Sequence, residues 1–303
     1  MEGFPTISII TVNYKQALVT NQLLDSLQGL TWPNYEVIIV DNASGIEDIN
    51  LLNLNYPNVT LIKSSENLGF AGGNNLGIRQ CKGDYILLLN NDTEVDAGFL
   101  EPMVSLFIDN PKIGAVSPKI KYFYQPDTIQ YAGFTDMNPF TMRMNAIGSK
   151  QKDNGDFDYV EKTHFAHGCA MMVSRNVIDI VGLMPDIYFL YYEEHDWSMA
   201  IKRAGFEIFY QPASIVFHKE SISTGKDSPL KTYYINRSRL IFTRRNYSGM
   251  QLLISILFQH VFSFPKNTLN YLLHAKFKHL KAYWKAYKWN ITHFSGLKTN
   301  PTF

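Results

Sequence analysis

Cysteine is scarce in this chain of 303 residues, which contains only Cys81 and Cys169 and no C-x-x-C pair. A disulfide framework and a thiolate zinc site are therefore excluded, and we expect a protein of the reducing cytoplasm. We also expect no signal peptide, because residues 1–5 lack a basic segment and the apolar run after them is short. The glycine patterns G-x-G-x-x-G and G-x-x-x-x-G-K-S/T are absent as well, which removes the main support for a dinucleotide-binding domain or a P-loop.

Acidic residues are missing from the last quarter of the chain. After Asp227 there is none, while residues 228–303 hold 12 of the 28 basic residues. The two parts carry about −11 and +12 charges, although the net charge of the whole chain is +1. A basic segment of this kind favours an anionic surface, either nucleic acid or anionic lipid. No nucleic-acid-binding motif is visible, so we expect no nucleic-acid partner.

Apolar runs long enough to span a bilayer are also lacking. The longest, residues 250–264, is interrupted by glutamine and histidine and stops at Pro265. Beyond it, leucine and aromatic side chains recur every three or four residues from Leu269 to Tyr287, with four lysines on another face. This pattern predicts an amphipathic helix that lies in a membrane interface. The alternative is a helix packed on its own domain or on a dimer partner.

What the sequence does contain is a series of apolar strands that end in polar residues. With 46% hydrophobic residues, the chain suffices for one large α/β domain with an appendage, or for two domains. The order of elements predicts an α/β fold with a Rossmann-like, mostly parallel sheet and flanking helices. We expect strands at 6–13, 35–41, 59–63, 84–89, 168–173, 206–210 and 214–217, helices at 17–27, 71–80, 97–108, 175–181 and 194–204, and short irregular strands and loops in the proline-rich stretch 111–160.

Several polar groups lie where such a sheet places a site. Asp92 follows the fourth strand and could hold a hard divalent cation on a diphosphate, although turns and helix N-caps use the same residue types. Residues 191–197 place three carboxylates and an imidazole among aromatic rings, which favours a general base; acids at a helix N-terminus are the alternative. His218 follows the strand at 214–217, and its role is either in the site or structural. Residues 67–75 stand between a strand and a helix, where backbone amides can approach a phosphate.

The order of these pieces resembles that of family 2 glycosyltransferases with the GT-A fold, particularly rhamnosyltransferase-like members that build bacterial surface polysaccharides. The resemblance covers about residues 6–245, so we expect a glycosyltransferase domain at 1–245 and a basic amphipathic helical tail at 246–303. It rests on the segments 8–14, 36–44, 67–75, 87–92, 192–197 and 218–223, followed by Arg237.

The resemblance implies a nucleotide-sugar site. Asp41 would read the pyrimidine base, and Asn13 and Tyr14 would line its pocket. The residues implied to bind the nucleotide sugar are Val12, Asn13, Tyr14, Asp41, Asn67, Asn75, Asn91 and Arg237.

It also implies a metal site and a base. Asp92, the last acid of the family's D-x-D-like motif, and His218 would hold a divalent metal, Mg²⁺ or Mn²⁺. Glu194 occupies the general-base position, with Glu193 and Asp196 as possible substitutes. Two departures from the family pattern are that Asn90 replaces the first acid of the metal motif and that the base, often Asp, is Glu194 here.

The implied reaction is inverting transfer of a sugar, with rhamnose as one candidate, from a UDP- or dTDP-sugar to a glycan or a polyprenyl-linked acceptor. The basic tail would place the enzyme at the inner face of the cytoplasmic membrane. Two alternatives stay open: a sugar-nucleotide nucleotidyltransferase and a non-catalytic, membrane-associated carbohydrate-binding or scaffold protein. The first would carry a glycine-rich basic loop directly after the first strand, and residues 11–15 form no such loop. The non-catalytic alternative stays open because Asn90 replaces the first acid of the metal motif.

Overall fold

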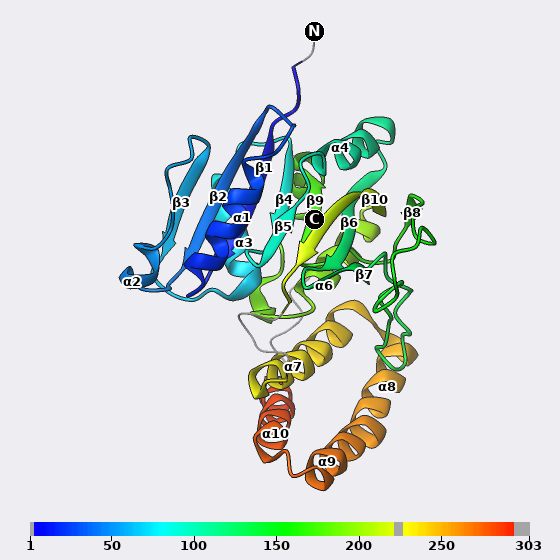
Figure 1. Ribbon diagram of the computed structural model, residues 1–303. Coiled ribbons are helices and arrows are strands. Elements are labelled where there is room, and N and C mark those ends of the chain that lie inside the picture. The colour runs from blue at the N-terminus through cyan, green and yellow to red at the C-terminus, as the bar shows by residue number, and fades with distance from the viewer. Residues whose placement is uncertain (1–2, 221–226, 294–303) are drawn as a thin grey trace.

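A ten-stranded mixed sheet forms the centre of the protein (Figure 1). The computed structural model describes residues 3–220 and 227–293, so residues 221–223 of the last segment that resembles the family lie outside the described residues. Four strands pair in parallel in the order β3-β2-β1-β4, which confirms the predicted mostly parallel sheet. They are β1 (Ile7–Asn13), β2 (Tyr35–Asn42), β3 (Val59–Ser64) and β4 (Tyr85–Leu89).

The other half of the sheet contains strands of both directions. After β4 come β9 (Ala170–Ser174), antiparallel to its neighbours, β6 (Ile113–Tyr122), β10 (Glu207–His218) and, at the edge, β5 (Thr93–Val95). Two further strands, β7 (Gln125–Tyr131) and β8 (Glu161–Lys162), pair with β6 and β10.

The prediction of only short irregular strands in residues 111–160 is wrong for β6, which has 10 residues and a buried first eight. Its proline, Pro118, lies opposite Gln211 at the point where the pairing of β10 shifts register to Ile215. A bulge tolerates the missing N–H of proline, so the strand continues through it. For the same reason β10 is one strand of 12 residues where two strands were expected.

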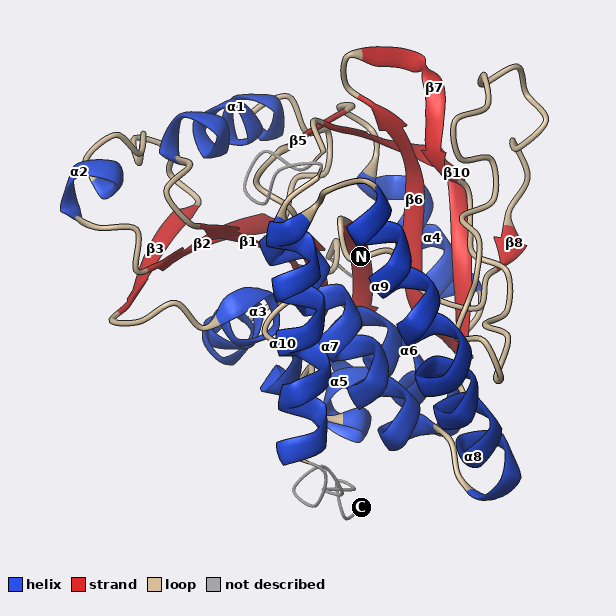
Figure 2. Ribbon diagram, turned by 90° about the horizontal axis from the view of Figure 1, so that it is seen from below, coloured by secondary structure: helices blue, strands red, loops and turns tan. Residues whose placement is uncertain are grey.

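Helices cover both faces of the sheet. One face carries α1 (Ala17–Leu27) and α4 (Leu100–Asp109), and the other carries α3 (Gly69–Gln80), α5 (Arg175–Val181) and α6 (Glu193–Arg203). Figure 2 shows α1 and α3 on opposite sides of the parallel strands. Within β4, Leu87 and Leu89 pack into the first layer, and Ile86 and Leu88 pack into the second. Burial of each such side chain stabilises the fold by about 1.5–3 kcal/mol. Two short helical turns, α2 (Ile46–Ile49) and η1 (Asp186–Tyr188), complete this part.

The C-terminal helices lie beyond the carboxyl edge of the parallel strands (Figure 1). The first, α7 (Pro229–Asn246), was not predicted from the sequence. Its Ile241 and Phe242 join the main core, whereas its Leu240 packs against Tyr283 and Tyr287 of α10. A helix that packs on two sides shows no single apolar stripe, which is why the pattern did not reveal it. The remaining helices are α8 (Gly249–Leu257), the π-helix η2 (Phe258–Ser263), α9 (Phe264–Leu273) and α10 (Phe277–Thr292).

The tail differs from its prediction in two respects. The apolar run ends at Pro265, but helical structure continues through it, because the proline stands in the first turn of α9 directly after the π-helical turn, where a missing N–H is tolerated. The expected single amphipathic helix is split into α9 and α10 by residues 274–276, with Ala275 at φ 50°. Among the helices that the structure describes, none has the length and apolar character needed to cross a membrane.

Candidate functional site

A cavity of about 440 Å³ opens at the carboxyl ends of the parallel strands, beside the first turn of α6. Gly69 and Phe70 at the start of α3 and Leu230 and Lys231 at the start of α7 also reach it. Eight residues proposed from the sequence line this cavity, namely Val12, Tyr14, Asn67, Asn91, Asp92, Glu193, Glu194 and His218. Segments that are far apart in the chain therefore meet where the strand order predicted a site.

Asn13 and Asp41 lie side by side at the ends of β1 and β2, as partners in the strand register. The Asn13 amide donates to Asp41 Oδ1 at 3.1 Å, and Asp41 Oδ2 accepts from the backbone N–H of Ser44 at 3.2 Å. Asp41 is only 1% exposed. The two side chains hydrogen-bond to each other and to the loop after β2, and they do not line the cavity wall. Their contact with a nucleotide base therefore stays a prediction.

Asp92 and His218 face each other at the cavity wall. Asp92 Oδ1 lies 3.2 Å from His218 Nε2, and His218 Nδ1 lies 2.8 Å from Gln130 Oε1. Burial disfavours the imidazolium, but the Cys169 thiol and the Asp92 carboxylate outweigh burial and raise the pKa of His218 well above its usual range. Because Gln130 Oε1 can only accept, Nδ1 carries the proton when the ring is neutral, and Nε2 then offers its lone pair.

Two oxygen or nitrogen ligands fit a divalent cation of the kind that binds a diphosphate. No group of three or more His, Cys, Asp or Glu side chains with metal-site geometry occurs among residues 3–220 and 227–293. A cation held on a diphosphate needs only one or two protein ligands, because phosphate oxygens and water complete its shell. Asp92 and His218 supply that number, and the family's further acid is Asn90 here, also at the cavity wall.

The first turn of α6 presents two neighbouring carboxyl groups to the cavity. It follows a turn in which Phe189, Tyr191 and Tyr192 all have positive φ, a conformation that aromatic residues rarely adopt. Burial and the nearby Glu194 raise the pKa of Glu193 well above its usual range, so Glu193 is held neutral. The Oε2 atoms of both glutamates are buried without a hydrogen-bond partner in the part of the chain that the structure describes.

Glu194 lies beside the His195 ring and the backbone of Gly168. The His195 ring lies with Nδ1 3.6 Å from Glu194 Oε1, and burial lowers the pKa of His195, which keeps the ring neutral. A Cβ atom on Gly168 would lie 3.4–3.6 Å from the end of Glu194, so the bare glycine leaves this carboxylate room at the wall. The Glu194 carboxylate therefore has room at the cavity wall to meet a hydroxyl group, as the position of a general base requires.

His167 lines the same cavity and was missed by the sequence analysis. Burial and the neighbouring His218 and His195 lower its pKa to about 3, so its ring, stacked on Phe134, is neutral. The sequence points to the carboxyl ends of parallel strands, whereas β9 is antiparallel and brings the residues before it to the same edge. The backbone bond from Asn90 N–H to the Cys169 carbonyl, 2.8 Å long, fixes that juxtaposition.

Three proposed site residues point elsewhere. Asn75 pairs with the backbone of Met184 through both amide atoms, at 2.7 and 3.1 Å. Asp196 accepts from Arg245 at 2.5 Å and so joins α6 to α7. Arg237 contacts the Ile187 carbonyl and the Trp289 ring, and its side chain lies outside the cavity lining. Their roles in substrate binding or catalysis stay predictions.

A mostly parallel sheet with its cavity at the carboxyl ends of the strands is the architecture of the GT-A glycosyltransferases. A mannosyltransferase from Pyrobaculum calidifontis, solved with GDP-Man and Mn²⁺, superposes with a TM-score of 0.59 and 16% identity over 96% of this chain and 76% of that one. GalNAc-T7, solved with UDP, GalNAc and Mn²⁺, has a TM-score of 0.60 and 15% identity over 78% of this chain and 51% of that one. These likenesses confirm the predicted fold.

Residues 8–181 match the family described as Glycosyl transferase family 2, and the chain belongs to this family. The low-salt glycan biosynthesis hexosyltransferase Agl10 of Haloferax volcanii is 24% identical over 82% of this chain and 82% of that protein. The N-acetylglucosaminyl-diphospho-decaprenol L-rhamnosyltransferase of Mycobacterium tuberculosis is 23% identical over 80% of this chain and 85% of that protein. The protein is a glycosyltransferase of glycan biosynthesis.

Proposed function

We propose that this chain transfers a sugar from a UDP- or dTDP-sugar to a hydroxyl group of a lipid-linked glycan, with inversion at the anomeric carbon. The observation that carries the proposal is the position of Glu194 in the cavity that Asp92 and His218 also line. The buried Oε2 atom of Glu194 lacks a partner in the described chain, and an unpaired buried carboxylate oxygen is costly unless a ligand satisfies it.

The proposed substrates are drawn from the similar proteins. The two solved neighbours hold GDP-Man or UDP with Mn²⁺. The name of the mycobacterial relative specifies rhamnose as the sugar and a diphospho-decaprenol-linked acceptor. A nucleotide-activated rhamnose is therefore the first donor to test. The cavity of about 440 Å³ is within the range of small-molecule sites.

Asp92 and His218 are the residues that would hold a divalent cation, through Oδ1 and Nε2. When bound, such a cation neutralises the charge that develops on the diphosphate leaving group. The Gln130 contact to Nδ1 orients the His218 ring so that Nε2 faces the cavity side of Asp92.

In the proposed mechanism, the two glutamates have different protonation states. Glu193 stays protonated because burial and Glu194 raise its pKa, which leaves Glu194 as the carboxylate that accepts a proton. In the reaction, the acceptor hydroxyl loses its proton to Glu194 while its oxygen bonds to the anomeric carbon. The bond from that carbon to the diphosphate oxygen breaks, and the nucleoside diphosphate leaves. A single displacement of this kind inverts the carbon and needs no protein nucleophile.

The full chain, incubated with a panel of UDP-, dTDP- and GDP-sugars and a prenyl-diphosphate-linked N-acetylglucosamine, tests the proposal. We expect one donor to be consumed, with release of its nucleoside diphosphate and a glycoside of the opposite anomeric configuration by NMR. A product with retained configuration would contradict the mechanism. Donor binding with neither transfer nor hydrolysis would favour the non-catalytic carbohydrate-binding alternative.

The proposed enzyme contacts an anionic membrane surface through α8, η2 and α9. Apolar side chains that are at least half exposed recur along these helices, and they are Met250 (68% exposed), Leu253 (51%), Leu257 (50%), Val261 (57%), Phe262 (64%), Leu269 (56%) and Leu273 (74%). By contrast, Tyr283 and Tyr287, which were expected to face lipid, are buried against α7. Exposed lysines on α9 and α10 complement a negative surface, and each contributes about 1 kcal/mol near anionic lipid. An inner-leaflet location follows from a lipid-linked acceptor.

A further inference from the structure

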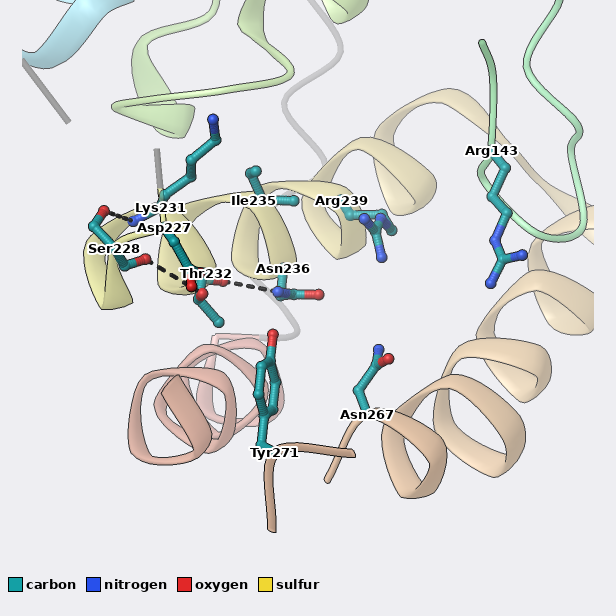
Figure 3. Close-up of a pocket in the computed structure, with 10 residues that line it drawn as sticks. All are labelled: Arg143, Asp227, Ser228, Lys231, Thr232, Ile235, Asn236, Arg239, Asn267 and Tyr271. Carbon is teal, nitrogen blue, oxygen red and sulfur yellow. Dashed lines mark hydrogen bonds between the residues drawn. The ribbon is translucent and has the colours of Figure 1, made fainter. Parts of the chain in front are cut away.

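A second cavity, of about 390 Å³, lies next to the first among the C-terminal helices. Its walls come from the first half of α7, from α9 and from the loop that carries Arg143 (Figure 3). Polar groups dominate its lining, among them Ser228, Asn236 and Tyr271. Lys231 lines both cavities, so the two are adjacent at the start of α7.

Three cations reach this cavity from separate positions, and none has a carboxylate partner within the described chain. They are Arg143, Lys231 and Arg239, and Figure 3 shows Arg143 extending from a segment apart from α7. The one acid of the lining, Asp227, already pairs with Lys276 at 2.7 Å. A cation that is partly withdrawn from water and lacks a counter-charge, as Arg239 does, is stabilised when an anion joins it.

Arg239 is the most constrained of the three. It is half-buried, its Nε donates to Tyr192 Oη at 3.0 Å, and that is its sole side-chain hydrogen bond among the residues described. The phenol fixes the orientation of the guanidinium and leaves the terminal nitrogens for another acceptor. Because Glu194 follows Tyr192 by two residues, an anion on Arg239 would be held close to the proposed base.

We propose that this cavity binds the phosphate or diphosphate group of the acceptor, an inference that rests on the proposed transfer to a lipid-linked glycan. The planar fork of arginine suits phosphate oxygens, and two arginines with one lysine are enough to neutralise the two negative charges of a diphosphate that is esterified at both ends. The occupant spans both cavities: its anion lies among Arg143, Lys231 and Arg239, and its sugar hydroxyl reaches Glu194 past Lys231. Its prenyl chain leaves beside α9, where Leu269 and Leu273 are exposed.

Calorimetric titration of the full chain with inorganic pyrophosphate in EDTA tests this site. Dependence on Arg143, which lines the second cavity and not the donor cavity, separates the two. We expect binding that weakens at least tenfold in Arg143→Gln and in Arg239→Gln. Arg143 is exposed and its side chain has no hydrogen-bond or ion-pair partner in the described chain, so Arg143→Gln should fold even if Arg239→Gln does not. The matched control is Arg79→Gln, an exposed arginine on α3 outside both cavities, which should bind as the unaltered chain does.

Binding of two further probes, farnesyl diphosphate and phosphatidylglycerol vesicles, distinguishes the molecules that could supply the phosphate group. Farnesyl diphosphate that binds more tightly than pyrophosphate, and depends on Arg143, identifies a prenyl diphosphate; equal binding of the two identifies a free diphosphate. Pyrophosphate that does not bind, or binds equally to Arg143→Gln, overturns the site. Binding to phosphatidylglycerol vesicles that needs Arg143, without binding of either soluble diphosphate, overturns it in favour of a lipid headgroup. Because no donor is present, Arg143-dependent binding would survive a failure of the transfer reaction itself.

Discussion

His218 Nε2 lies 3.2 Å from Asp92 Oδ1, and this contact joins the end of β10 to the residues that follow β4. The register of the sheet fixes it, because His218 pairs with Thr93 of β5 and the Lys219 N–H donates to the Asp92 carbonyl at 2.8 Å. Both side chains are less than 10% exposed. Two ligand atoms from distant parts of the chain are thus held together before any ligand arrives.

Replacement of Asp92 tests the metal site. Asp92→Asn removes the charge but keeps the size, so we expect metal-dependent turnover to fall at least about a hundredfold, since a bound cation supplies several kcal/mol to a reaction of this kind. Asp96→Asn, an exposed aspartate outside the cavity, is the control and should keep normal activity. Unchanged turnover and Mn²⁺ dependence in Asp92→Asn would show that the metal does not bind there.

Replacement of Gly69 tests the close contact between the start of α3 and Phe189 at the cavity wall. The φ of Gly69 is +71°, and a Cβ atom there would lie 2.3 Å from the Phe189 carbonyl oxygen. At Gly205, with φ +90°, a Cβ atom would meet nothing within 4 Å. We expect Gly205→Ala to cost about 1–2 kcal/mol of unfolding free energy through backbone strain alone, and Gly69→Ala to cost at least roughly 1 kcal/mol more through overpacking. Urea unfolding measures both; equal losses would mean that the contact with Phe189 relaxes freely.

Glu193 makes stability depend on pH. Its pKa is raised in the folded protein, so between the usual carboxyl pKa and the raised value the unfolded chain binds fewer protons than the folded one. Stability of the unaltered protein therefore falls as pH rises through that window, by up to about 1.4 kcal/mol per pH unit for this group. Glu193→Gln cannot ionise, so its advantage in urea midpoint should grow from pH 5 to pH 8. A constant difference between the two proteins would mean that Glu193 is ionised in the fold.

The exposed apolar side chains of α8 and η2 are expected to carry membrane contact. Leu257→Ser with Phe262→Ser should reduce co-sedimentation with phosphatidylglycerol vesicles at low salt, because both side chains are exposed and would leave water on binding. Ile108→Ser, on α4 and 62% exposed, is a matched control that should sediment normally. Added salt should weaken binding of the unaltered chain. A full chain that ignores these vesicles at low salt would instead mark the tail as a packing or dimerisation element.

The sequence predicted the parallel half of the sheet well, because its apolar runs end in polar residues at one edge. Asp92 could be placed at that edge on this basis, whereas the family resemblance was needed to add Glu194 and His218. His167 could not be placed there, because β9 is antiparallel and brings the residues before it to the same edge, which no local pattern reveals.

The other misses also have non-local causes. The bulge that admits Pro118 into β6 forms in β10, far along the chain. Lys231 and Arg239 look like part of one undivided basic segment, since α7 packs on two sides and carries no clear stripe. Arg143 comes from a distant loop, so the sequence does not place it beside them.

The most direct test of the account is steady-state kinetics of Glu194→Gln beside Glu193→Gln. Glutamine keeps the shape of the Glu194 side chain but cannot accept a proton, so we expect turnover to fall at least about a hundredfold with donor affinity nearly unchanged. Glu193→Gln, which mimics a residue already neutral, should keep most of its turnover. Normal turnover in Glu194→Gln, with the loss appearing in Glu193→Gln or Asp196→Asn, would contradict the assignment of Glu194 as the base.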